Sequence, residues 1–540
     1  MRSGNVCFVL HTHLPYCRLA GRWPHGEEWF HEAMLECYLP LVRAFRRLSN
    51  QVNGSLGVTI NVTPILAEQM GDAVMLDHFR EYLADRIERA EKDVVRFATA
   101  SANRAATARF HRDRYQAIRM FFEEDIQGDM LAALRGLEDS GHIEIATCAA
   151  THGYLPLLDD PAAVRFQVQT GVESHIRNFG RAPRSFWLPE CAYEPGLERY
   201  LEEAGIKVFF VETHLVEGGK ARGKALGEVV GLYPEVRVPV AAPVELPVSS
   251  GTTFRAYHVG QSNVSAIARN ERTGLQVWSA SHGYPGEARY REFHKKEGES
   301  GLHYWRVTGA EVDLGDKEEY DPRAAAESVS WHADHFRDLI RYELDAFQRG
   351  AGEDGLVLAS YDTELFGHWW LEGVDWLEGV IRRLASDSAF NLVTSGDYVT
   401  KQPPTHSIDL PEGSWGNGGD HRTWMNDDTA WTWPEIKSRQ VRAHGLLRND
   451  SPAARQLGRE LLLLQSSDWQ FLMTTGQAHD YAVERFWSHA ERFDRLADAI
   501  EGGYPALNEQ VEELFELDNP FPGINPMLYT DHPTALGVRA

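Results

Sequence analysis

Short apolar runs recur along the chain, and a polar motif follows each of them. The runs are four to six residues long and rich in Val, Ile, Leu and Phe, as buried β-strands are. They cover residues 6–10, 58–62, 143–148, 185–189, 208–211 and 356–360. Strands separated by long connections pair in parallel, so the pattern predicts an α/β fold built on a β/α barrel.

The polar motifs that follow these runs supply histidines and carboxylates. Their residues are His11 and His13, Asn61, His152, Glu190, Glu212 and His214, and Asp362 and Glu364. A parallel β/α barrel carries its catalytic groups just beyond the carboxyl ends of its strands. The placement therefore predicts an enzyme.

A long stretch between the second and third predicted strands lacks a strand pattern. Leu83, Ile87, Ala90, Val94 and Ala98 recur there at helical spacing among charged residues. A crossover between parallel strands needs only one helix, so the extra length predicts a helical insertion. We expect the insertion over residues 73–135, between barrel segments 1–72 and 136–400.

The pattern changes again near residue 402, where two consecutive prolines end regular structure after a strand-like run at 391–394. Beyond it, Ser451 before Pro452 has the form of a helix N-cap. A second helical stripe is formed by Phe486, Ala490, Phe493, Ala497 and Ile500. We expect a C-terminal helical domain over residues 401–540.

Composition narrows the class of protein. The 540 residues are 43% hydrophobic and 25% charged, which is typical of soluble globular proteins with more than one domain. A net charge of -25 disfavours nucleic acid and anionic membranes as partners. The 15 tryptophans supply flat faces for sugar rings as well as core volume, so a neutral substrate is favoured.

The cellular compartment is indicated by two further features. The first apolar run is too short for a signal peptide, and the sequence has no stretch of about 20 apolar residues that would span a bilayer. The five cysteines are an odd number, widely spaced and without a CxxC motif. We therefore expect a cytoplasmic protein with reduced thiols and without a disulfide framework or structural zinc.

Glu190 and Asp362 form the main catalytic hypothesis, because each follows an apolar strand in the same way. At a separation of about 5 to 5.5 Å, two such carboxyl groups act as nucleophile and general acid in a retaining glycosidase. The competing carboxylates are Glu194, Glu212, Glu364 and Asp375, and either chosen residue has a structural alternative as a salt-bridge or cap residue.

His11 and His13 point to the same side of an extended segment. This spacing suits contacts to substrate or a carboxylate, two metal ligands, or structural histidines. His152 lies at a strand end by the same logic. We favour contacts to substrate or a carboxylate and expect no metal.

The aromatic residues offer two interpretations. Trp369, Trp415, Trp424 and Trp278 stand near Gly, Asn or Pro, and they suit either sugar stacking or a buried cluster between domains.

The segment 214–252 is rich in Gly, Val and Pro and has no sustained periodicity. A loop of this length is either disordered or a functional lid, and we favour a lid.

Several of these motifs resemble, in order, those of glycoside hydrolase family 57, and within it the 1,4-α-glucan branching enzymes. The similar segments are residues 11–16, 149–156, 186–193 and 361–370. The resemblance extends along the whole chain. It implies an incomplete (β/α)7 barrel with a helical insertion and a C-terminal α-helical domain.

The resemblance also implies the residue roles. Glu190 would be the nucleophile, and Asp362 would be the general acid and then the base. The substrate-binding residues would be His11, His13, His152, Trp278, Trp369, Trp415, Trp424 and Asp468, with Tyr233 on the lid. The implied substrate is an α-1,4-glucan, with no metal or organic cofactor, and a monomer is expected.

Other functions remain open at this stage. An α-amylase or a 4-α-glucanotransferase would use the same site with a different acceptor. A metal-dependent deacetylase or amidohydrolase would use His11 and His13 as ligands and lose activity with chelator. A noncatalytic glucan-binding protein would bind glucan without turnover.

Overall fold

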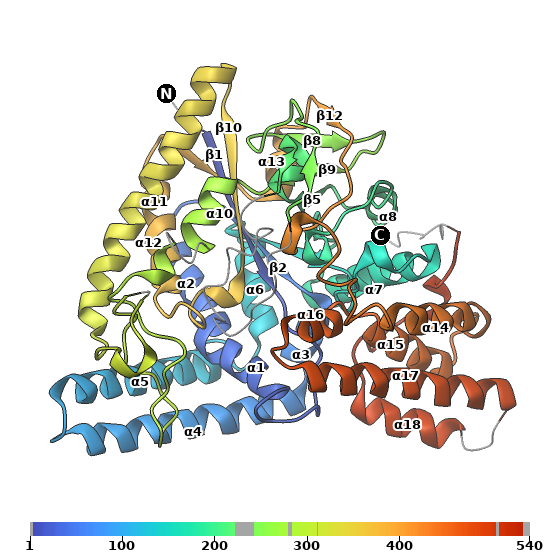
Figure 1. Cartoon of the computed structure of the whole chain (residues 1–540), viewed down its shortest axis with the longest axis horizontal. Coiled ribbons are helices and arrows are strands. Elements are labelled where there is room, and N and C mark those ends of the chain that lie inside the picture. The colour runs from blue at the N-terminus through green and yellow to red at the C-terminus, as the bar shows by residue number, and fades with distance from the viewer. Residues whose placement is uncertain (1–3, 222–241, 279–282, 310, 504–506, 533–540) are drawn as a thin grey trace.

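The computed structural model describes residues 4–221, 242–278, 283–309, 311–503 and 507–532. A curled sheet lies at the centre, with helices around it and a helical group in the C-terminal third (Figure 1). The strand order is β10-β1-β2-β3-β4-β5-β9-β8-β12, and β11 also pairs with β1. The chain is therefore an α/β protein with a half-barrel sheet.

All six predicted strands are present. They are β1 (Gly4–Thr12), β2 (Val58–Val62), β3 (Ile143–Cys148), β4 (Ser185–Trp187), β5 (Val208–Val211) and β10 (Gly355–Asp362). These strands and β9 (Ser265–Ala268) run parallel. The edge beyond β9 is formed by β8 (Ala256–Val259), which is antiparallel to β9, and β12 (Ser407–Ile408); β11 is Phe390–Leu392.

Helices connect the parallel strands and cover the sheet. The first half contains α1 (Glu27–Ala33), π-helix η1 (Met34–Tyr38), α2 (Leu39–Ser49), α3 (Pro64–Met70), α6 (Met130–Asp139), α7 (Pro161–Phe179), α8 (Glu198–Glu203) and α9 (Thr213–Glu217). The second half contains α10 (Glu271–Trp278), α11 (Pro322–Ala351), α12 (Gly373–Ala385) and α13 (Ser395–Lys401). Single-turn 3-10 helices η4 (Pro189–Cys191) and η8 (Thr363–Leu365) follow β4 and β10.

The core lies on both faces of the sheet. Val6, Phe8 and Leu10 of β1 join one hydrophobic cluster, whereas Cys7 and Val9 join the other. Alternate side chains of a strand point to opposite faces, so a strand that is covered on both sides is apolar throughout. This explains why the predicted strands read as continuous apolar runs.

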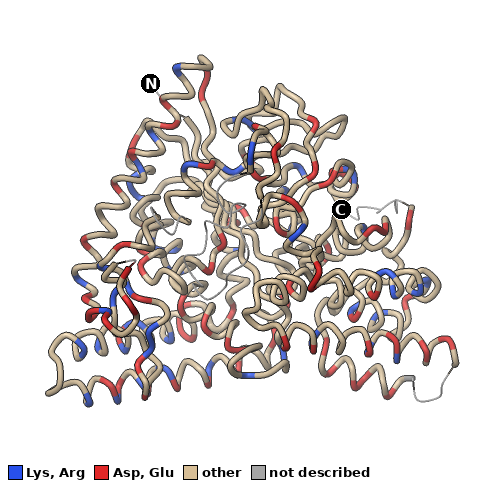
Figure 2. The backbone as a smooth tube through the Cα atoms, in the orientation of Figure 1, with Lys and Arg blue, Asp and Glu red and all other residues tan. Residues whose placement is uncertain are grey.

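Two long helices lie where the sequence predicts an insertion. Helices α4 (Ala73–Phe97) and α5 (Ala102–Met120) pack together and are followed by π-helix η2 (Phe121–Asp125). The Tyr304 hydroxyl donates to Asp93 of α4 at 2.8 Å, and Thr107 of α5 donates to the Tyr320 carbonyl at 3.0 Å. Charged side chains gather on these and the other outer helices, whereas the central strands are largely uncharged (Figure 2).

The described chain from residue 432 to residue 517 consists of helices and short connections. It contains α14 (Thr432–Leu446), α15 (Pro452–Leu464), α16 (Asp468–Thr475), α17 (His479–Gly502) and α18 (Leu507–Leu517). The Ser451 side chain accepts from Ala454 N and caps α15, as the sequence predicts. The Thr151 hydroxyl after β3 donates to the Leu462 carbonyl of α15, so these helices contact the strand ends directly.

The segment 214–252 is only partly described. Residues 222–241 lie outside the described residues, and so does Tyr233. On either side, β6 (Gly219–Lys220) pairs with β7 (Glu245–Leu246). The Val244 amide donates to the Gly418 carbonyl at 2.8 Å, which fastens this end of the segment to the loop that carries Trp415.

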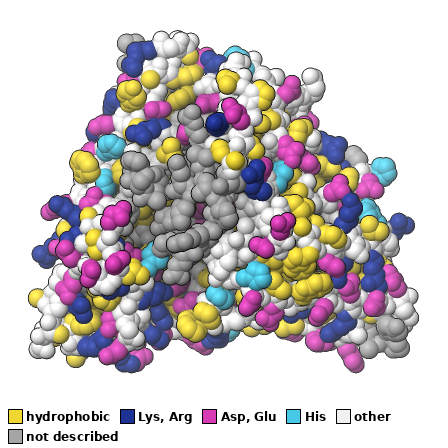
Figure 3. All heavy atoms as spheres, in the orientation of Figure 1, with side chains coloured by type: hydrophobic (Ala, Val, Ile, Leu, Met, Phe, Trp, Pro, Cys, Tyr) yellow, Lys and Arg dark blue, Asp and Glu magenta, His cyan; other side chains and the backbone are white. Residues whose placement is uncertain are grey.

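All five cysteines are free and buried. Every helix in the described part of the chain is too short or too polar to cross a bilayer. Acidic and basic side chains are interspersed over the face that Figure 3 shows.

Candidate active site

The candidate site lies at the carboxyl ends of the parallel strands. His11 near the end of β1 is in register with Asn61 of β2 and with Asp362 of β10. His152 follows β3, and Glu190 follows β4. The parallel register therefore gathers the predicted residues at one edge of the sheet, as expected for a β/α enzyme.

Glu190 has a left-handed backbone conformation that residues other than glycine rarely adopt. Its φ is 60° and ψ is 23°, and φ is also positive at Cys191 (49°) and His152 (58°). Left-handed residues cluster at functional sites because the surrounding structure must hold them there. The chain therefore leaves the extended conformation of β4 in a tight left-handed turn at Glu190.

Trp415 holds Glu190 through both main chain and side chain. Its indole Nε1 donates to Glu190 Oε2 at 2.5 Å, and its amide donates to the Glu190 carbonyl at 3.1 Å. The Glu190 side chain is 14% exposed. A hydrogen bond from a neutral donor to a half-buried carboxylate is among the stronger kinds, so Trp415 fixes this carboxylate in place.

His152 lies between Glu190 and the C-terminal helices. Its Nδ1 is 3.9 Å from Glu190 Oε1 and 2.9 Å from the Ser467 hydroxyl. The Ser467 amide donates to the His152 carbonyl at 3.1 Å. Ser467 is the N-cap residue of α16, so the C-terminal helices position a residue of the site.

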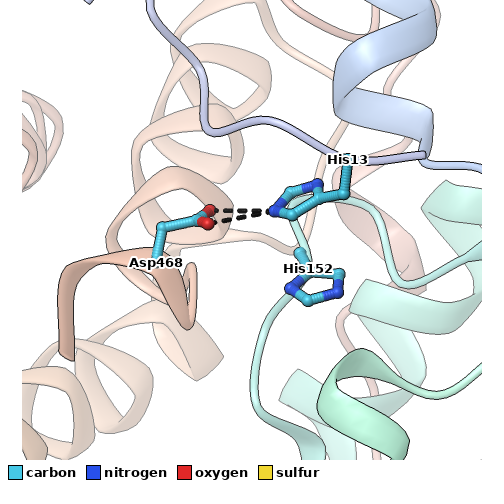
Figure 4. Close-up of side chains that lie close together, drawn as sticks. All are labelled: His13, His152 and Asp468. Carbon is cyan, nitrogen blue, oxygen red and sulfur yellow. Dashed lines mark hydrogen bonds and ion pairs between the residues drawn. The ribbon is translucent and has the colours of Figure 1, made fainter. Parts of the chain in front are cut away.

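His13 is held between two elements (Figure 4). Its Nε2 lies 3.0 Å from Asp468 Oδ1 at the start of α16, and its Nδ1 lies 3.0 Å from the Thr63 hydroxyl. Burial by itself lowers the pKa of His13, but the charge and hydrogen bond of Asp468 outweigh it and raise the pKa above its usual value. This pairing favours the protonated imidazole.

Four rings form a stacked row along the site. Trp187 lies 4.5 Å from His11, His11 lies 5.1 Å from His152, and His152 lies 3.9 Å from His13, measured between ring centroids. The Asn61 side-chain oxygen contacts His11 Nδ1 at 2.7 Å. The stacking fixes the planes of the three imidazoles relative to Trp187.

Asp362 ends β10, and Glu364 follows it on η8. Glu364 Oε1 accepts from the Tyr38 hydroxyl at 2.5 Å and from the His13 amide at 3.1 Å. Burial raises the pKa of Glu364 to about 7; the Tyr38 hydrogen bond opposes this rise, and the Asp362 charge adds to it. Glu364 is therefore a buried, hydrogen-bonded carboxyl group, whereas Asp362 stands at the end of the strand.

The other competing carboxylates, Glu212, Asp375 and Glu194, differ from Glu190 in pairing or exposure. Glu212 Oε1 pairs with Arg269 at 2.7 Å, and both side chains are buried. Asp375 is exposed on α12. Burial raises the pKa of Glu194, which follows Glu190 closely, with a further rise from the Glu412 charge. We therefore retain Glu190 and Asp362 as the catalytic candidates.

The predicted aromatic residues differ in their placement. Trp415 contacts Glu190 directly, whereas Trp424 is buried and stacks on Tyr154 at 4.4 Å. Trp369 is half-buried and packs on Phe293 at 4.2 Å. Trp278 ends α10 and is buried. The structure thus brings Trp415 to the carboxylate, and one face of Trp424 is covered by Tyr154.

Sequence reasoning missed several supporting residues. Four residues contact the predicted site although the sequence pattern does not mark them as site residues. They are Trp187, Thr63, Ser467 and Tyr38. The alternation at the end of β2 places Asn61 and Thr63 on one side of the strand, and this signal pairs them with His11 and His13. The contribution of Ser467 has no signal in the local pattern.

The arrangement can perform two kinds of chemistry. Ligand atoms of His13, His152 and Asp468 lie within 4.8 Å of one another, which suits either a metal ion or the hydroxyls of one sugar. The hydrogen bonds to Thr63, Ser467 and Asp468 orient these imidazoles without an ion. The fixed carboxylate of Glu190 beside them suits nucleophilic attack.

Comparison with known families divides the chain at the start of the C-terminal helices. The profile of glycosyl hydrolase family 57 matches residues 7–411. The profile named 1,4-alpha-glucan branching enzyme, C-terminal, matches residues 437–529.

Individual relatives resemble the chain over nearly its whole length. A 1,4-alpha-glucan branching enzyme of Thermococcus kodakarensis is 42% identical over 96% of this chain and 77% of its own. The crystal structure of a branching enzyme from Pyrococcus horikoshii has a TM-score of 0.87 and 38% identity, covering 98% of each chain. An α-amylase from Thermotoga maritima has a TM-score of 0.83 and 29% identity, covering 98% of this chain and 99% of its own.

Proposed function

The chain belongs to glycosyl hydrolase family 57, and from this premise we propose that it is a 1,4-α-glucan branching enzyme. It cleaves an α-1,4-glucosidic bond and transfers the released chain to a 6-hydroxyl, which forms an α-1,6 branch. The observation that carries this proposal is similarity to branching enzymes across both the catalytic region and the C-terminal helices.

The reaction proceeds with retention in two steps. Glu190 attacks the anomeric carbon while Asp362 protonates the leaving glycosidic oxygen, which gives a covalent glycosyl-enzyme and a free chain end. Asp362, now a carboxylate, then removes the proton of an incoming 6-hydroxyl. That oxygen attacks the anomeric carbon and releases Glu190 as a carboxylate.

The surrounding residues bind the donor sugar. We assign His11, His13 and His152 to contacts with its hydroxyls, supported by the row of imidazoles beside Glu190. Asp468 orients His13 from the C-terminal helices. Trp415, Trp369 and Trp278 are assigned to glucose stacking along the chain. Trp424 is buried against Tyr154, so we assign it to packing and not to a sugar contact. The site needs no metal or organic cofactor for this chemistry.

Several further properties accompany the proposal. The parallel strands form the incomplete (β/α)7 barrel over residues 1–72 and 136–400, with the insertion at 73–135 and the C-terminal domain at 401–540. We assign the segment 214–252, with Tyr233, to a lid that keeps water from the glycosyl-enzyme. Free buried thiols fit a cytoplasmic enzyme, and its substrate is an α-1,4-glucan such as amylose or a glycogen-like polysaccharide.

Incubation with linear amylose tests the function. Proton NMR should detect new α-1,6 linkages while a reducing-end assay shows little increase, because transfer to a 6-hydroxyl conserves the number of reducing ends. Rising reducing ends without α-1,6 signal would make the protein an α-amylase, and redistributed linear chains would make it a 4-α-glucanotransferase. Glu190→Gln, which keeps the side-chain shape without the nucleophilic charge, should abolish every one of these activities.

A further inference from the structure

A π-helix packs against the segment that follows β10. Helix η1 lies between α1 and α2 and packs against η8. The Cys37 thiol donates to the Thr363 carbonyl at 3.0 Å, and Glu36 Oε2 contacts His368 Nδ1 at 2.7 Å. Single-turn π-helices inside α-helices are frequent at functional sites.

The approach of the two segments is close enough to require a glycine. Gly367 has a φ of 95°, and a Cβ at this position would clash with the Glu36 carbonyl. A residue with a side chain would therefore separate η1 from the segment that follows Asp362. The contact between η1 and this segment is a fixed part of the structure.

Tyr38 and Glu364 lie at the centre of this contact. Glu364 comes directly after the Asp362-Thr363 pair, and its Oε1 receives both the Tyr38 hydroxyl and the His13 amide. The Thr12 and Thr363 hydroxyls meet beside it at 2.7 Å. One carboxyl oxygen thus joins the segment His11–His13 at the end of β1 to the end of β10, which carries Asp362.

Burial raises the pKa of Glu364 to about 7, so its carboxyl group keeps its proton below that pH. Cys37 and Tyr38 face it from η1, His13 faces it just beyond β1, and Asp362 faces it from the end of β10. A neutral carboxyl group keeps a carbonyl oxygen that accepts two hydrogen bonds. A second buried negative charge beside Asp362 would be unfavourable.

We propose that Glu364 is a positioning residue for the transfer reaction, in which its carbonyl-type oxygen aligns Asp362 with the histidines of β1. This inference rests on the proposed role of Asp362 as acid and base. Glu364 acts through Tyr38 and the His13 amide, and its charge is not used.

Two substitutions at Glu364 separate geometry from charge. Glu364→Gln keeps an acceptor oxygen, so branching kcat should stay within about threefold of wild type. Glu364→Ala removes the acceptor of two buried donors and should lower kcat by about 10- to 100-fold. The KM for amylose should change by less than about threefold in both, because the carboxyl orders reacting groups and leaves the remaining sugar contacts intact.

Tyr38→Phe supplies a second measurement if the alanine variant does not fold. It leaves the Glu364 side chain in place and removes one donor, so kcat should fall by about three- to tenfold. Circular dichroism and thermal unfolding establish that each variant is folded. Wild-type kcat in both Glu364→Ala and Tyr38→Phe would overturn the inference.

A Gln variant as impaired as the Ala variant would also overturn it, because the charge or proton of Glu364 would then be required. Asp362→Asn separates this outcome from failure of the proposed function. If Asp362→Asn retains wild-type activity, the proposed mechanism is wrong whatever the Glu364 variants do. If Asp362→Asn is inactive and Glu364→Ala is normal, only the role of Glu364 is wrong.

Discussion

Removal of the indole donor from Glu190 should make the covalent intermediate accumulate. Trp415→Phe keeps an aromatic ring and the main-chain contact but removes the 2.5 Å hydrogen bond to Oε2. The bond is stronger to the free carboxylate than to the neutral ester of the glycosyl-enzyme. Its loss therefore penalises the free enzyme more than the intermediate.

The size of the effect follows from the two kinds of hydrogen bond. Bonds to charged groups contribute about 1.5–3 kcal/mol and neutral ones about 0.5–1.5 kcal/mol. The difference is about 1 to 1.5 kcal/mol, which is roughly a tenfold shift of the equilibrium toward the glycosyl-enzyme. The Glu190 side chain is only 14% exposed, so water replaces the lost donor poorly.

The assay is intact mass spectrometry of enzyme that is quenched in acid during turnover of amylose. The glycosylated fraction of Trp415→Phe should exceed that of wild type, and the release step should slow. Trp424→Phe is the matched control, because Trp424 stacks on Tyr154 and should leave the fraction unchanged. An equal or smaller glycosylated fraction in a folded Trp415→Phe enzyme would refute the reasoning.

Three further predictions concern charge and metal. Asp468→Asn removes the charge that pairs with His13 at 3.0 Å and should lower kcat/KM by about tenfold in initial-rate assays; an unchanged value would contradict the orienting role. EDTA should leave activity unchanged, whereas loss that added metal restores would show that His13, His152 and Asp468 bind an essential ion. The raised pKa of Glu364, from 4.5 to about 7, means that the folded protein keeps a proton that the unfolded chain loses. Wild-type stability should therefore fall by up to about 3 kcal/mol between these pH values, and Glu364→Gln should lack this loss; thermal unfolding at pH 5 and pH 8 measures it, and parallel pH profiles would contradict it.

Much of the fold could be predicted because its signals are local. Apolar runs located each of the six predicted strands, and helical stripes located α4 and α17. Strand ends also supplied His11, His152 and Glu190, since a parallel register brings neighbouring ends together. Local periodicity and strand position are sufficient for these features.

Other parts of the site depend on contacts between distant segments. Asp468 reaches His13 across 455 positions of sequence, and Tyr38 reaches Glu364 across 326. Neither contact has a periodic signal. The π-helix that presents Tyr38 continues a helical pattern, so its wider turn is not visible in the sequence. The left-handed backbone at Glu190 depends on the surrounding structure as well.

The left-handed residues also show what the site costs the fold in stability. Glu190, Cys191 and His152 each hold a conformation that costs about 1–2 kcal/mol more than it would for glycine. Together they consume a sizeable share of the 5–15 kcal/mol that keeps a typical domain folded. Glycine or asparagine would hold this backbone at a lower cost. The side chains of Glu190, Cys191 and His152 therefore lower the stability of the fold, and the surrounding packing must offset that loss.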